Sequence, residues 1–246
     1  MKLIDTCGCF PTGKHYPGIA HLIKVGAVGV ATELDPDSRW VDHPIAFLDT
    51  ETTGTDPQVD RVIEVGIVIG QGGAVESRHS WLINPGVPIP EESRKVHGIS
   101  DEDVADKSSF GELAGEMVAT FRGALPAAYN ADFDRGFFLA ELERAGYQDD
   151  DPPPAIRAEV VWLDPLVWAR ELFKGQGESR ALGAVAKRLG VALERAHRAT
   201  DDAEAALEVM YALAGDTRVP DGYAAMVQEQ RRLGRIQLEA QRFWRK

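Results

Sequence analysis

The stretch Phe47–Gly54 reads FLDTETTG and joins an apolar run to two acids and a turn. Residues 45–48 are all apolar, which predicts a buried strand with Asp49 at its end. Side chains two residues apart on a strand point to the same side, so Asp49 and Glu51 direct their carboxylates to one place. Such carboxylates repel each other unless a cation lies between them, and hard divalent ions such as Mg²⁺ prefer oxygen ligands. An acid-rich strand end in a solvated turn fits the same pattern.

Strands and helices are expected in a characteristic order around this stretch. Strands are predicted at Ile45–Leu48, Arg61–Ile69, Ala74–Ile83, Leu125–Tyr129 and Val160–Leu163, and helices from about Phe110 and at Asp132–Arg144, Pro165–Phe173, Arg180–Leu189 and Arg198–Ala214. Three leading strands, followed by strands that alternate with helices, indicate a mixed-sheet α/β domain at 45–215. Residues 1–44 are expected to form an N-terminal extension, with one or two short strands at 22–34, and residues 216–246 a basic, helical tail.

Two further acid clusters lie where helices are expected to begin. Residues 129–134 read YNADFD, at a change from strand to helix where sites of α/β sheets are common. Asp132 is the better candidate for the helix N-cap, which places Asp134 in the first turn. Residues 197–202 read HRATDD, so His197 lies at the start of a helix and Asp202 just over one turn inside it. Taken singly, both clusters also fit acids that complement a helix dipole.

The three clusters together resemble the DEDD exonuclease superfamily, in the subgroup whose third motif carries histidine. The likeness consists of D-x-E, then N-x-x-F-D about 80 residues later, then H-x-x-x-x-D about 65 residues further on. It covers about residues 45–215 and includes VHGIS at 96–100 and LGAVAKRLG at 182–190. The chain is similar in these motifs to the proofreading (epsilon) subunits of bacterial DNA polymerase III.

The resemblance implies a ribonuclease H-like fold, a mixed five-stranded sheet flanked by helices, and an enzyme. It implies a 3′→5′ exonuclease that releases mononucleotides from DNA ends, in proofreading or repair, with two divalent cations, Mg²⁺ or Mn²⁺. The implied catalytic residues are Asp49, Glu51, Asp134, His197 and Asp202, the four acids as metal ligands and the histidine as general base. The implied substrate-binding residues are Thr52, Thr53, Val96, His97, Asn130 and Phe133. Where the family often has histidine this chain has Tyr129, so we expect altered contacts to the strand end.

Two alternatives stay open beside DNA cleavage. One is an exoribonuclease that trims RNA 3′ ends, because discrimination between DNA and RNA rests on contacts to a single 2′-OH. The other is a non-catalytic module associated with a polymerase, against which the presence of all five catalytic positions argues. Single-stranded or frayed 3′ ends are the expected substrate.

The composition limits the surroundings in which this chemistry occurs. The net charge of −12 in 246 residues argues against a protein that holds duplex by neutralising many phosphates. The objection weakens where acids gather around divalent ions, which invert the local field. We expect no membrane span and a cytoplasmic location, because no apolar run is long enough and the N-terminus lacks a signal-peptide core. Cys7 and Cys9, one residue apart, are expected to be free thiols.

The two ends of the chain carry further sequence features. Residues 8–15, GCFPTGKH, fail the phosphate-loop pattern at His15, and a zinc site from Cys7, Cys9, His15 and His21 has the wrong cysteine spacing. Residues 228–246 hold six basic residues and two acids, with apolar residues at helical spacing. This segment is expected to dock on its own domain, to bind a polymerase subunit or to steer nucleic acid.

Overall fold

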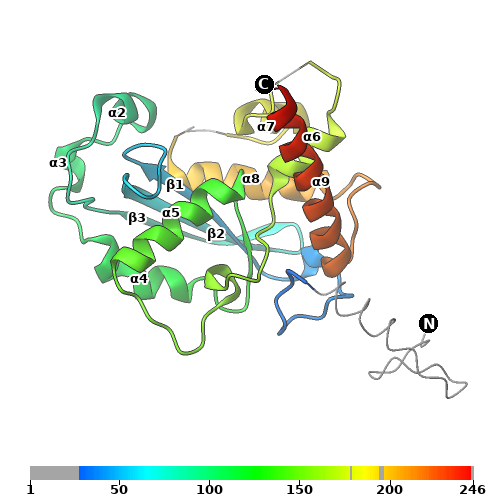
Figure 1. The fold of residues 1–246 in the computed structure, drawn as a ribbon, viewed down its shortest axis with the longest axis horizontal. Coiled ribbons are helices and arrows are strands. Elements are labelled where there is room, and N and C mark those ends of the chain that lie inside the picture. Colours follow the sequence, from blue (N-terminus) through cyan, green and yellow to red (C-terminus); the bar gives the residue numbers. More distant parts are fainter. Residues whose placement is uncertain (1–27, 178, 194–196, 245–246) are drawn as a thin grey trace, which may run out of the picture.

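The computed structural model describes residues 28–177, 179–193 and 197–244 (Figure 1). Its strands are β1 (Ile45–Thr52), β2 (Val62–Gln71), β3 (Ala74–Leu82) and β4 (Leu125–Ala127), in the sheet order β3-β2-β1-β4. The helices of the described residues are η1 (Trp40–Asp42), α2 (Glu91–His97), α3 (Asp101–Val104), α4 (Phe110–Ala119), α5 (Ala131–Arg144), η2 (Pro154–Ile156), α6 (Pro165–Leu172), α7 (Leu182–Leu189), α8 (Ala199–Leu213) and α9 (Tyr223–Trp244). Among these, no helix is both long and apolar enough to cross a bilayer.

The sheet is mixed, as the sequence predicts. β1 and β3 both pair antiparallel with β2, and β4 pairs parallel with β1. Gly72 and Gly73 connect β2 to β3, and both have positive φ, 62° and 90°, which a two-residue hairpin favours. The mixed α/β class is therefore confirmed.

Successive residues of β1 face two different cores. Ile45 and Phe47 pack with α6, α7, α8 and α9, whereas Ala46 and Leu48 pack with α4 and α5. Figure 1 shows α4 and α5 on one side of the sheet and α8 on the other. The alternation continues beyond Leu48, so Asp49 is on the α8 side of the strand and Thr50 on the α5 side.

The fifth strand expected at 160–163 is reduced to a single bridge between Leu163 and Ala127. Leu163 donates to the carbonyl of Pro126 and accepts from Ala128, at 2.9 and 3.1 Å. Pairing stops there because the next residue, Asp164, caps α6, and Pro165 occupies its first turn. The parallel edge of the sheet is therefore short.

The C-terminal helix α9 packs along its own domain. Its buried side chains, which recur at helical spacing, are Tyr223, Met226, Val227, Gln230 and Leu233. Gln230 accepts from the backbone N–H of Asp164 and donates to the carbonyl of Trp162, at 2.9 and 2.8 Å. The structure thus matches the self-docking alternative for the inward face of this segment.

Two parts of the chain differ from the expected elements. Residues 28–34 form turns rather than a strand, because Gly29 has a φ of 95° that breaks extended backbone. The rest of the expected strand region lies outside the described residues, as do residues 8–15, Cys7, Cys9 and His21. The short helices α2 and α3 were not anticipated from the sequence.

Candidate active site

β1 places Asp49 and Glu51 on the side of the sheet that α8 covers. In the β1–β2 register, Asp49 lies opposite Gly66 and Glu51 opposite Glu64. β4 pairs with β1 only as far as Phe47, so the edge of β1 beyond that residue is not covered by a strand. Both acids therefore stand where side chains from helices can reach them.

α5 brings Asp134 to this uncovered edge. The backbone N–H and the hydroxyl of Thr50 both donate to Oδ1 of Asp134, at 2.9 and 2.8 Å, and Asp134 is only 3% exposed. The predicted N-cap, Asp132, is wrong, since the N-cap is Asn130, two residues earlier and in the left-handed conformation. Asp134 lies in the first turn, as expected.

α8 brings Asp202 and His197 to the same place from the other face of the sheet. The backbone N–H of His197 donates to Oδ2 of Asp202 at 2.8 Å, and His197 has a positive φ of 67°. One ligand atom each from Glu51, His197 and Asp202 lies within 4.8 Å of the others. The strand acid, the helix acid and the histidine thus converge on one place.

A glycine allows α8 to approach the sheet this closely. A Cβ on Gly66 would lie 2.3 Å from the carbonyl carbon of Ala199 and 2.4 Å from the backbone nitrogen of Thr200. Both contacts are with backbone, which cannot rotate away as a side chain would. Gly66 therefore sets the distance between the strand acids and the first turn of α8.

A fifth carboxylate, Glu64, was missed by the sequence reasoning. It is 1% exposed and receives the guanidinium of Arg198 at 2.6 Å and the backbone N–H of Ala199 at 3.1 Å. A buried carboxylate is costly unless it is paired and hydrogen-bonded, and Glu64 is both. This pair ties the start of α8 to β2. The signal was present in RVIEVGIVI, where one acid interrupts an apolar strand.

Burial and mutual repulsion raise the pKa values of the site acids. The pKa of Asp49 is well above its ordinary value because of burial first, and then because of Asp134 and Asp202. Burial, followed by repulsion from Asp202 and Glu64, raises the pKa of Glu51 to about 8. Burial raises the pKa of Asp134 to about 7 against the opposing hydrogen bonds from Thr50. Without a cation, the protonated, neutral form of these three acids is therefore favoured at this site.

The donor set fits a divalent cation. The four carboxylates form an oxygen-rich ligand set of the kind that hard divalent ions take. Arg198 donates to Glu64, and its charge lowers the pKa of Glu51 by less than burial and the neighbouring acids raise it. A bound cation would supply the positive charge that the raised pKa values call for.

A pocket of about 560 Å³ adjoins the acids. It is lined by Thr50, Glu51, Thr52, Thr53, Gly54, Thr55, Asp60, Pro90, Glu92, Ser93, Val96, His97 and Phe133. Five of the six predicted substrate-binding residues are in this set, and the sixth, Asn130, lines a different hollow. The short helix α2, absent from the sequence prediction, supplies one wall of the pocket.

His97 presents a hydrogen-bond donor at this pocket. Its Nδ1 accepts from the backbone N–H of Ile99 at 3.0 Å, and its buried Nε2 has no partner among the described residues. Burial lowers the pKa of His97, which favours the neutral ring with its proton on Nε2. That N–H is available to a bound ligand.

Tyr129 directly precedes Asn130, the N-cap of α5. Its hydroxyl donates to the carbonyl of Arg180 at 2.6 Å, and burial raises its pKa, so it remains a donor. The tyrosine thereby ties the segment before α7 to the end of β4. Whether the exchange for histidine alters contacts to a strand end stays a prediction.

A metal-free preparation should lose stability as the pH rises. The folded-state pKa values of Glu51, about 8, and Asp134, about 7, exceed the ordinary values of 4.5 and 3.8. A carboxyl group whose pKa is raised by folding stabilises the fold below its unfolded pKa, and this stability is lost as the pH passes through the folded pKa. In EDTA, we expect the melting temperature of the wild type to fall between about pH 4 and pH 8.5 more steeply than that of Glu51→Gln.

The difference between wild type and Glu51→Gln in the pH dependence of the melting temperature removes the contribution of other titrating groups. The matched control is Glu92→Gln, an exposed acid on α2, which should keep the slope of the wild type. Equal slopes for wild type and Glu51→Gln would contradict the repulsion within the site.

The fold and the acid cluster together indicate a class of protein, the exonuclease domains. Within that class, the model of the RNase_T exonuclease family matches residues 46–210, and the chain belongs to this family. The chain is 34% identical over 180 residues to the PolC-type DNA polymerase III of Thermotoga maritima, covering 73% of this chain and 12% of that protein. It is 33% identical over 172 residues to the epsilon subunit of DNA polymerase III of Treponema pallidum, covering 69% and 76%. The chain thus spans about an eighth of the PolC-type relative.

A solved structure agrees with the fold. Exonuclease X, in complex with 5′-overhanging duplex DNA, superposes with a TM-score of 0.56 at 21% identity over 74% of this chain and 99% of the other. The family and the fold confirm the expected ribonuclease H-like architecture, with four paired strands and a bridge in place of five strands.

Proposed function

We propose that this chain is a 3′→5′ exonuclease that releases mononucleotides from DNA ends in proofreading or repair. The observation that carries the proposal is the convergence of Glu51, His197 and Asp202 within 4.8 Å beside a pocket of about 560 Å³. A pocket of this volume is of a size that can hold one nucleotide. Cleavage next to a single bound nucleotide favours removal of terminal residues.

Asp49, Glu51, Asp134 and Asp202 are the proposed ligands of two Mg²⁺ or Mn²⁺ ions. When bound, such ions supply an activated water and stabilise charge on the attacking and leaving oxygens. The hydrogen bonds from Thr50 keep one oxygen of Asp134 engaged, which fixes the direction of its carboxylate.

His197 is the proposed general base. Its imidazole is exposed at the start of α8, where it can reach a water at the site and release the proton to solvent. The bond from its backbone N–H to Asp202 and the pairing of Arg198 with Glu64 hold this residue in its left-handed conformation. The base is thereby positioned by backbone contacts, and its ring stays free to act.

The pocket beside the acids is the proposed site of the 3′-terminal nucleotide. Phe133 offers an aromatic ring on which the terminal base can stack. Because all four bases can stack in this way, the enzyme would accept any terminal nucleotide. The Nε2–H of His97 is the proposed donor to an oxygen of this nucleotide. Thr52, Thr53 and Val96 also line this pocket.

DNA is the favoured substrate because the relatives include two DNA polymerase III proteins and exonuclease X was solved with DNA. RNA trimming is the alternative substrate. A cytoplasmic location goes with this activity. Association with a polymerase through residues 216–246 is a weaker proposal, since the apolar stripe of α9 is buried on its own domain.

A nuclease assay on matched DNA and RNA oligonucleotides tests the proposal. With Mg²⁺ or Mn²⁺, we expect a 5′-labelled single strand of DNA to shorten one nucleotide at a time, faster than RNA of the same sequence. EDTA should abolish the shortening. Products that arise within the strand, or a preference for RNA, would overturn the DNA exonuclease assignment.

A further inference from the structure

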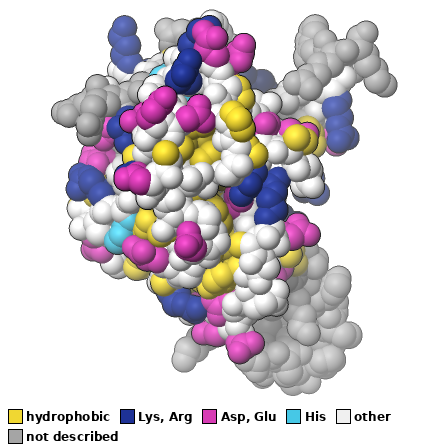
Figure 2. Space-filling view, turned by 90° about the vertical axis from the view of Figure 1, so that its left-hand side faces the viewer, with side chains coloured by type: hydrophobic (Ala, Val, Ile, Leu, Met, Phe, Trp, Pro, Cys, Tyr) yellow, Lys and Arg dark blue, Asp and Glu magenta, His cyan; other side chains and the backbone are white. Residues whose placement is uncertain are grey.

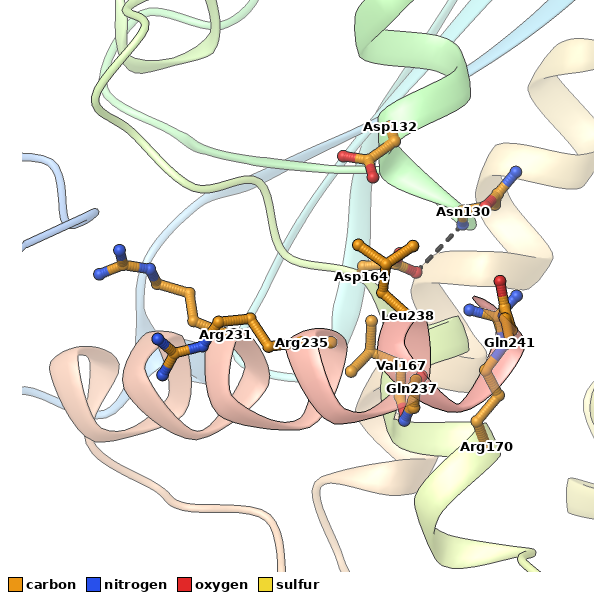
Figure 3. Close-up of a pocket in the computed structure, with 11 residues that line it drawn as sticks. Asn130, Asp132, Asp164, Val167, Arg170, Arg231, Arg235, Gln237, Leu238 and Gln241 are labelled. Atoms are coloured by element: carbon orange, nitrogen blue, oxygen red, sulfur yellow. Dashed lines mark hydrogen bonds between the residues drawn. The ribbon is translucent and has the colours of Figure 1, made fainter. Parts of the chain in front are cut away.

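A second hollow lies next to the candidate active site and is bounded by α9. It has a volume of about 460 Å³ and is lined by Asn130, Asp132, Asp164, Val167, Arg170, Arg231, Gly234, Arg235, Gln237, Leu238 and Gln241. Figure 3 shows α9 along one side of this hollow, with the first turn of α5, marked by Asp132, facing it. The family model ends at residue 210, so the wall that α9 forms lies outside the part of the chain that the family matches.

The first turn of α5 separates this hollow from the terminal-nucleotide pocket. Asn130 and Asp132 line the α9 hollow, whereas Phe133 lines the pocket beside the acids. Asp134 follows Asn130 by four residues, or roughly 6 Å along a helix axis. A strand whose 3′ nucleotide occupied the pocket would therefore need to cross only one helical turn to enter the α9 hollow.

The charges of the hollow suit a phosphate backbone. Arg170, Arg231 and Arg235 are its basic residues. None of the three is in a salt bridge with a described residue, and Arg231 donates to the backbone carbonyl of Val28 at 3.1 Å. Of its two acids, Asp164 is buried and its carboxylate accepts from backbone N–H groups of residues 130, 131 and 166, at 3.0, 3.2 and 2.8 Å. Those bonds satisfy Asp164 internally, which leaves Asp132 as the exposed acid against three guanidinium groups.

The excess of basic side chains in this hollow contrasts with the negative net charge of the whole chain. Figure 2 shows acidic and basic side chains interspersed over the side of the molecule that carries α2 and α3. Arg218 and Arg232, elsewhere on the surface, are paired with Asp216 and Glu229 at 2.7 and 2.6 Å. In a protein of net charge −12, three arginines that line one hollow without a salt bridge to a described residue favour the binding of a polyanion there.

We propose that the α9 hollow binds the phosphates of the substrate strand on the 5′ side of the scissile bond. This inference rests on the proposed exonuclease function and adds a binding region that extends the site away from the terminal nucleotide. Arg231 and Arg235 bind the phosphates from α9, and Arg170 does so from α6. The C-terminal helix thereby gives longer strands higher affinity than short ones.

The test compares two double variants of the full chain. Arg231→Gln with Arg235→Gln removes two charges from the hollow, and Arg218→Gln with Arg232→Gln removes two charges from surface residues outside it. Glutamine keeps a good helix propensity, so α9 should remain folded, which its melting temperature checks. The substrates are a single-stranded oligonucleotide of about 16 nucleotides and the p-nitrophenyl ester of thymidine 5′-monophosphate, which reaches only the terminal pocket.

The hollow variant should raise KM for the oligonucleotide about tenfold and flatten the dependence of log KM on log salt by about 1.4. Its hydrolysis of the ester should equal that of the wild type, and the surface variant should change KM less than about twofold for either substrate. Equal effects of the two variants on the oligonucleotide, with a wild type that cleaves it, would overturn the inference and leave the proposed function standing. A wild type that cleaves neither substrate would overturn both.

Discussion

Asp49→Asn should lower the rate of mononucleotide release about a thousandfold, with the fold intact. After burial, the charges of Asp134, Asp202 and Glu51 all raise the pKa of Asp49, so its carboxylate lies near each of them. Loss of this carboxylate weakens the proposed cation site, whose stabilisation of transition-state charge amounts to several kcal/mol, or about three factors of ten in rate. The measurement is single-turnover release of the terminal nucleotide with saturating Mg²⁺ or Mn²⁺.

The matched control is Asp150→Asn, an exposed acid in the loop after α5. It makes the same chemical change at a distance from the site and should keep wild-type activity. The melting temperature of Asp49→Asn in EDTA should be no lower than that of the wild type, because the variant relieves repulsion. A folded Asp49→Asn with full activity would exclude the proposed role of the acid cluster.

Gly66→Ala should lower activity at least about a hundredfold and destabilise the fold by roughly 1–3 kcal/mol. The new methyl group would lie 2.3 Å from the backbone of Ala199, so α8 must shift away from β2. His197 and Asp202 would move with it, while Asp49 and Glu51 stay on the sheet. Misplacement of catalytic groups by about 1 Å is enough for an effect of this size.

The control for Gly66→Ala is Gly115→Ala on α4. Gly115 is exposed and helical, and a Cβ there meets no atom within 4 Å. That variant should be slightly more stable than the wild type and fully active, because alanine is the better helix former. Loss of stability without loss of activity in Gly66→Ala would contradict the view that this residue sets the distance between α8 and the strand acids.

Local patterns in the sequence predict much of this fold. Alternation along β1 places Asp49 and Glu51 on one side, and helix starts place Asp134 and Asp202 one turn inside α5 and α8. These features depend on residues close together in the chain, for which periodicity is informative. The N-cap of α5 was misassigned because the left-handed Asn130 begins the helix without a side-chain cap.

Long-range features could not be predicted in this way. The partner of Glu64 is Arg198, 134 residues away, and no local pattern connects them. α2 has seven residues and α3 four, which is too short for a helical period to register. The sequence of the basic tail fits three alternatives: docking on its own domain, binding a polymerase subunit or steering nucleic acid. The face that α9 turns inward becomes clear only from the contacts of Gln230 and its buried apolar neighbours with the rest of the domain.

Because Arg198 pairs with Glu64, the attachment of α8 to the sheet and the binding of a cation depend on different carboxylates. The attachment of α8 to the sheet uses a carboxylate outside the proposed ligand set, together with the backbone N–H of Ala199. A cation bound at the proposed site could therefore leave or exchange without releasing the helix that carries its proposed ligand Asp202. Chelation should empty the site while its walls persist, so that a returning ion meets ligands already in place.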